Sequence, residues 1–108
     1  MPRYLGLFRY SPEGAKGFLK EKAASREAAI RKAYEGIGGK VEAVYWGAGG
    51  EYSGAVVVEL PDAATGAAFG MVVGASGAFD AVTLMEVVTS SELDRALAKT
   101  ITYRPPGG

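Results

Sequence analysis

The chain has 108 residues, of which 48% are hydrophobic and 22% are charged, and these fractions are typical of a single globular domain. Cysteine and histidine are absent, which excludes disulfides, thiol nucleophiles, zinc–thiolate sites and the commonest general base. Twelve basic and twelve acidic residues give a net charge of zero, which argues against a general polyanion binder.

No segment has the pattern of a membrane span or a signal sequence. The longest charge-free stretch, residues 63–79, is short and rich in Gly and Ala, whereas a span needs about 20 apolar residues. The first residues enter a strand pattern directly. We therefore expect a cytoplasmic protein with no membrane partner. We also expect no nucleic-acid partner, because the strand around residues 55–58 lacks the aromatic side chains that stack on bases.

The first half of the chain predicts a strand, a long helix and a second strand. Residues 4–10 are rich in aromatic side chains and predict the first strand. Ser11 and Pro12 form a helix start signal, and apolar residues at a spacing near 3.6 predict one helix that continues to about Gly36. Residues 41–46 predict the second strand.

The second half predicts a strand, a helix, another strand and a short final helix. Residues 52–60 form a valine-rich strand, and Pro61-Asp62 then starts a helix over residues 63–75. Residues 81–88 predict the fourth strand, and Ser90-Ser91-Glu92 begins a short helix that ends near Lys99.

The order β-α-β-β-α-β with a C-terminal helix predicts an α+β sandwich of the ferredoxin-like type. Residues 1–99 should form this single domain, with residues 100–108 as a tail. Both main helices should cover one face of the sheet. The strands are apolar on both faces, however. In the first strand, Leu5 and Leu7 lie on one face and Tyr4 and Phe8 on the other. We therefore expect a second copy of the sheet to cover the other face, which gives a homodimer.

Four motifs around the second hairpin resemble, in this order, the GYD domain family: Gly38-Gly39-Lys40-Val41, Tyr45-Trp46, Gly50-Glu51-Tyr52-Ser53 and Glu59-Leu60-Pro61-Asp62. The resemblance covers most of residues 3–97 and implies a small bacterial protein with a dimeric α/β-barrel fold. It implies no particular reaction. Ser53 stands where the family motif has Asp, so any function of that carboxylate is absent here.

Arg26 is the first candidate site residue, because it shares a helix face with the apolar residues Ile30 and Tyr34. A charge on such a face is costly unless it is paired. One interpretation is an ion pair with a sheet carboxylate such as Glu59 or Glu86. The other is an anion clamp in a pocket between helix and sheet.

Three aromatic residues, Tyr45, Trp46 and Tyr52, flank the glycine turn of the second hairpin. They are expected either to pack across the strands or to form a wall for a flat ligand, with the Tyr52 hydroxyl as a donor. Glu59 and Glu86 are expected on neighbouring strands, where they would form salt bridges, lie exposed to solvent or perform acid–base chemistry.

A stripe of glycines, Gly66, Gly70 and Gly74, recurs every four residues along the second main helix. Such a smooth face indicates tight packing of the helix against a neighbouring backbone.

These features predict a homodimer that binds a small hydrophobic or anionic molecule in a cavity between sheet and helices. The expected ligand-binding residues are Arg26, Tyr34, Trp46, Tyr52 and Glu59; no metal and no cofactor are expected. One alternative is a cofactor-independent enzyme that oxygenates or isomerises an activated aromatic or keto substrate. Another is a structural or regulatory interaction module without a ligand. A cavity of about a few hundred Å³ favours ligand binding, whereas a sealed core favours the interaction module.

Overall fold

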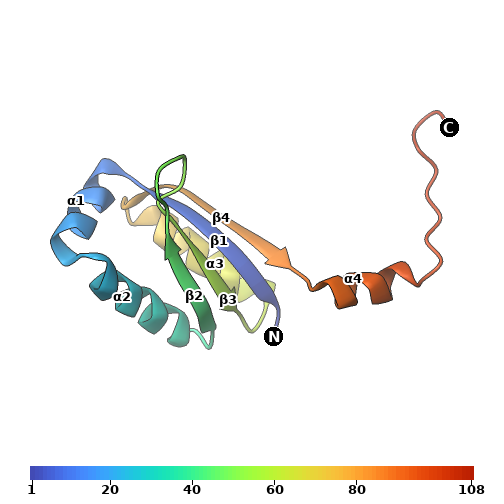
Figure 1. Cartoon of the computed structure of the whole chain (residues 1–108), viewed down its shortest axis with the longest axis horizontal. Coiled ribbons are helices and arrows are strands. Elements are labelled where there is room, and N and C mark those ends of the chain that lie inside the picture. Colours follow the sequence, from blue (N-terminus) through green and yellow to red (C-terminus); the bar gives the residue numbers. More distant parts are fainter.

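The computed structural model describes residues 1–108 and contains four strands and four helices (Figure 1). The elements are β1 (Arg3–Tyr10), α1 (Pro12–Glu21), α2 (Ala23–Glu35), β2 (Lys40–Trp46), β3 (Gly54–Glu59), α3 (Ala63–Ala75), β4 (Phe79–Val87) and α4 (Ser90–Leu97). The strands form an open antiparallel sheet in the order β2-β3-β1-β4. No helix has the length and apolar character needed to cross a membrane.

The prediction of one long helix before β2 was wrong, because the chain breaks at Lys22. Lys22 has φ 72° and ψ 170°, and its backbone N–H donates to the carbonyl oxygen of Phe18 at 2.7 Å. The break lets α1 place Phe18 against Trp46, with ring centroids 4.9 Å apart, while α2 runs along β2 and buries Tyr34. Hydrophobic periodicity does not register a change of direction at a single exposed residue.

Lys22→Gly is expected to stabilise the protein, because only glycine adopts this backbone conformation without strain. The expected gain is about 1 kcal/mol, or a rise in Tm of about 4–8 °C. Thermal unfolding followed by circular dichroism measures it. In contrast, Lys16→Gly lies in the interior of α1 and should cost about 1 kcal/mol. A loss of stability in both variants would contradict the break at Lys22.

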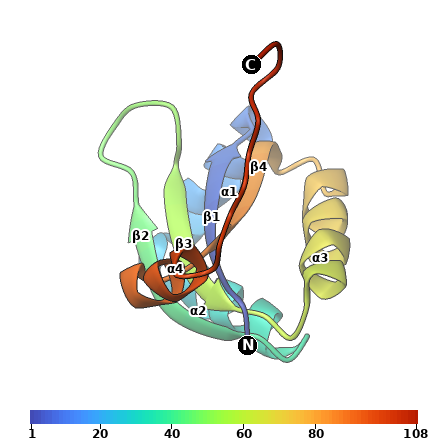
Figure 2. The same ribbon diagram turned by 90° about the vertical axis from the view of Figure 1, so that its right-hand side faces the viewer.

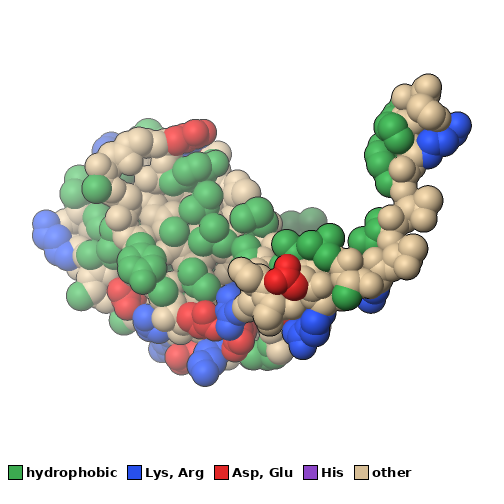
Figure 3. Space-filling view, turned by 45° about the vertical axis from the view of Figure 1, so that its right-hand side comes forward, with side chains coloured by type: hydrophobic (Ala, Val, Ile, Leu, Met, Phe, Trp, Pro, Cys, Tyr) green, Lys and Arg blue, Asp and Glu red, His purple; other side chains and the backbone are tan.

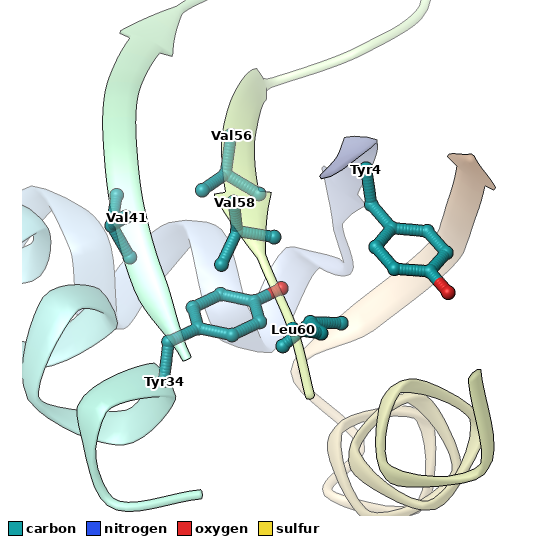
Figure 4. Close-up of a cluster of buried hydrophobic side chains, with 6 residues drawn as sticks. All are labelled: Tyr4, Tyr34, Val41, Val56, Val58 and Leu60. Carbon is teal, nitrogen blue, oxygen red and sulfur yellow. The ribbon is translucent and has the colours of Figure 1, made fainter. Parts of the chain in front are cut away.

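The hydrophobic core lies on the face of the sheet that α2 and α3 cover. Along β1 the buried residues alternate as Tyr4, Gly6 and Phe8. The core cluster consists of Tyr4, Tyr34, Val41, Val56, Val58 and Leu60 (Figure 4). Tyr34 of α2 also contacts Phe69 of α3, with ring centroids 4.4 Å apart. The two helices therefore meet over the same face.

The opposite face of the sheet, which we call the open face, has no helix over it. Its apolar side chains include Leu5, Leu7, Ala55, Val57, Met85 and Val87. Charged side chains border them, and Arg3 pairs with Glu42 at 3.1 Å. In the space-filling view, hydrophobic side chains gather over the sheet between these charges (Figure 3). The sequence pattern of two apolar faces is thus present in the fold.

Helix α4 and residues 98–108 form an arm that projects away from the sheet (Figure 1). The radius of gyration is 16.9 Å, whereas a compact chain of this length has about 13 Å. Thr89 and Glu92 form a capping box that starts α4. Leu93 and Leu97 are at least half exposed. Residues 101–103, which have strand character in the sequence, pair with no strand. The apolar side of the arm is therefore largely exposed.

Candidate functional site

A cavity of about 200 Å³ lies between the sheet and helices α2 and α3. Its lining is mostly hydrophobic, with Gly6 and Val56 from the sheet, Ile30 from α2 and Phe69 from α3. Helix α3 stands to one side of the sheet beyond β4 (Figure 2). Val82 of β4, which also lines the cavity, is 42% exposed. The cavity is therefore apolar and open to solvent.

The glycines of α3 explain how the cavity forms. A Cβ atom at Gly66 would lie 3.0 Å from Leu60 and 3.2 Å from Leu84, so α3 approaches the sheet closely there. A Cβ atom at Gly70 or Gly74 would meet nothing within 4 Å. The prediction of tight packing therefore holds at Gly66 and was wrong for the rest of the stripe. At Gly70 the missing side chain leaves space that belongs to the cavity.

Arg26 lines this cavity from the first turns of α2. Its Nη1 lies 3.4 Å from Oε2 of Glu21, at the end of α1, and its side chain is 28% exposed. The predicted pairing with Glu59 or Glu86 was wrong, because the break at Lys22 brings Glu21 beside Arg26 instead. The remaining guanidinium N–H groups donate no hydrogen bond within the chain. Most of the hydrogen-bonding capacity of Arg26 is therefore free.

Tyr34 also lines the cavity, and it is 8% exposed. Its ring points from α2 toward β3 (Figure 4). Burial raises the pKa of the Tyr34 hydroxyl above the ordinary tyrosine value. The hydroxyl is therefore protonated at neutral pH and can donate a hydrogen bond.

Tyr10 is a cavity residue that sequence reasoning did not select. Its ring stacks on Phe79 with centroids 5.1 Å apart and lies 5.7 Å from Phe18. Its hydroxyl oxygen is buried and has no hydrogen-bond partner. The alternation Tyr4, Phe8, Tyr10 placed it on the helix-covered face, but that pattern could not indicate an unpaired hydroxyl.

Trp46 and Tyr52 do not reach this cavity. They line a separate groove at the hairpin between β2 and β3, together with Tyr45 and Glu51. The Trp46 ring packs against Phe8 at 5.9 Å, beneath α1. The structure therefore separates the aromatic pair from Arg26 and Tyr34.

Ser53 joins the hairpin to β1. Its Oγ accepts a hydrogen bond from the backbone N–H of Tyr10 at 3.0 Å, and its own N–H donates to the Phe8 carbonyl at 2.7 Å. The serine at the position where the resemblance implies Asp therefore holds the end of β1, next to the tyrosine that lines the cavity.

Glu59 lies on the open face, where its Oε1 is 3.7 Å from Nη2 of Arg3. The prediction that Glu59 and Glu86 lie on neighbouring strands was wrong, because β1 separates β3 from β4. Glu86 is opposite Tyr4, on the helix-covered face. Burial and the carboxylates of Glu86 and Asp62 raise the pKa of Tyr4. No group of three or more acidic side chains is placed to hold a metal ion.

The GYD domain family matches residues 4–97 of the chain. The match spans the elements from β1 to α4, so it includes every residue of the cavity wall. No curated protein matches the chain. The resemblance carried by the hairpin motifs is confirmed over most of the sequence, and the chain belongs to the GYD domain family.

Proposed function

We propose that the protein is a cytoplasmic homodimer, a dimeric α/β-barrel of ferredoxin-like subunits, that binds a small hydrophobic or anionic molecule. The cavity between the sheet, α2 and α3 carries the proposal, because it is apolar, open and about 200 Å³ in volume. An apolar cavity of about 150 Å³ is large enough to take up benzene. The ligand is therefore a molecule of about one ring.

The two alternative functions receive less support from the geometry. A cofactor-independent enzyme would rely on Tyr52 and Arg26, and these residues lie in separate sites. An interaction module without a ligand would have a sealed core around Arg26, whereas Arg26 borders open space. Ligand binding needs only the cavity and the free donors that line it.

The homodimer is supported by the amount of apolar surface that one chain leaves exposed. Only eleven of the 108 residues are buried. The open face carries a row of aliphatic side chains that includes Leu5, Val57 and Met85. Helices α2 and α3 cover only the other face of the four-stranded sheet, so the open face is free to pack against a second sheet at about 10 Å.

Gly70→Leu tests the cavity, because a leucine side chain there would fill it. Toluene serves as the probe and is titrated while NMR chemical shifts of Ile30 and Phe69 are followed. We expect saturable binding to the original protein and at least about a tenfold loss of affinity in Gly70→Leu.

Gly74→Leu is the matched control, since Gly74 lies on the same helix with open space around it and does not line the cavity. It should bind toluene as the original protein does. Equal affinity in both variants, or no saturable binding of toluene, benzamide or benzoate, would contradict the proposal.

A further inference from the structure

We propose that the cavity is selective for a small aromatic carboxylate. The ring would lie in the apolar cavity, and the carboxylate would be held at its mouth by the Arg26 guanidinium and the Tyr10 hydroxyl. This inference rests on the proposed function, because it assigns the ligand chemistry of the same cavity.

The apolar part of the cavity is suited to an aromatic ring. Four aromatic side chains line it besides Tyr10: Phe8, Tyr34, Phe69 and Phe79. Aromatic rings pack favourably against one another in edge-to-face and offset arrangements. The volume of about 200 Å³ limits the ligand to one ring with a short substituent.

The charged end of the site is Arg26. It lines both the cavity and an adjoining open groove, so it stands where the two meet. No other basic side chain lines either space. The two N–H edges of a guanidinium match the two oxygens of one carboxylate. One arginine therefore favours a singly charged, planar anion over a phosphate.

Two carboxylates, Glu13 and Glu21, also line the groove. The Glu21 contact with Arg26 is a single one at 3.4 Å, and Glu21 is 46% exposed. Such an exposed pair contributes little free energy. A ligand carboxylate that reaches Arg26 from the cavity side would be less hydrated and would compete well with Glu21.

The Tyr10 hydroxyl is the second group that would bind the carboxylate. It is buried without a hydrogen-bond partner, although buried polar groups are almost always paired. Tyr10 lines the same two spaces as Arg26. Its ring packs against Phe18 and Phe79, with centroids 5.7 and 5.1 Å away. A carboxylate oxygen at the mouth would accept its hydrogen bond.

Titration calorimetry with benzoate and its uncharged isostere benzamide tests this inference. Benzoate should bind at least about tenfold more tightly than benzamide, because a hydrogen bond to a charged group is stronger than a neutral one. Arg26→Gln should weaken benzoate binding by about 10- to 100-fold and change benzamide binding by less than about threefold. Tyr10→Phe should weaken benzoate binding by about three- to tenfold.

Lys32→Gln is the matched control, because it removes the same charge from an exposed position of α2 outside both spaces. It should leave both affinities unchanged. Glu21→Gln removes the competitor of the ligand and should strengthen benzoate binding by about two- to fivefold. Glu21 does not line the cavity. The benzoate affinity of Glu21→Gln therefore tests the carboxylate site even if Arg26→Gln fails to fold.

The outcomes separate the two proposals. Toluene binding without any preference for benzoate, or an equal loss of benzoate and benzamide in Arg26→Gln, would overturn the carboxylate site and leave the apolar cavity in place. Benzoate affinity that is unchanged or lower in Glu21→Gln would also overturn it. A failure of all three probes to bind would overturn the proposed function itself.

Discussion

Gly14→Ala is expected to lower the free energy of unfolding by about 3 kcal/mol. A Cβ atom at Gly14 would overlap the carbonyl oxygen of Ala78 and would lie 3.0 Å from Cδ1 of Tyr10. The obstacle is backbone, so no change of rotamer relieves it. The turn at Ala78 would have to move, and it is held by Ser11, whose N–H donates to Ala78 at 2.9 Å and whose hydroxyl donates to Gly77 at 2.7 Å.

Urea unfolding measures this change, with Gly17→Ala as the matched control. Gly17 lies in the same helix, and a Cβ atom there would meet nothing within 4 Å. Gly17→Ala should therefore stabilise the protein by about 1 kcal/mol through helix propensity alone. Opposite signs at the two glycines are the expected result. A gain of stability at both would contradict the close packing of α1 on the turn before β4.

Val57→Lys is expected to convert the proposed homodimer into monomers. Val57 lies in the middle of the open face, opposite Leu5 of β1. In a dimer that packs sheet on sheet, two copies of the new charge would be buried close together without partners. An unpaired buried charge costs several kcal/mol, about 3–5 in measured cases, which is enough to dissociate an interface. In the monomer the same lysine remains in contact with water, so the fold should persist.

Sedimentation equilibrium of the purified protein measures the oligomeric state. Val72→Lys makes the same substitution on α3, where Val72 is 72% exposed. This control should leave the dimer intact. Dissociation in Val72→Lys but not in Val57→Lys would place the interface on α3 and refute the sheet-on-sheet arrangement. A monomeric original protein would refute the dimer.

Most secondary structure of this chain followed from local signals. Helix α3 spans residues 63–75 as predicted, because Asp62 caps it by accepting the N–H of Thr65 at 2.7 Å. The strands agreed with prediction to within about two residues, because alternation reports the two faces of a strand directly. The arrangement of Arg26 and Tyr34 along one helix face was likewise visible, and both residues line the cavity.

The sequence by itself thus determined the order of elements, the two apolar faces of the sheet and membership of the GYD domain family. Only the tertiary structure decided the break at Lys22, the pairing of Arg26 with Glu21, the unpaired hydroxyl of Tyr10 and the separation of Trp46 and Tyr52 from the cavity. The physical reason is the separation in sequence over which each kind of signal acts. Periodicity and capping depend on residues within one or two turns, whereas cavities and ion pairs depend on distances between elements far apart in the chain.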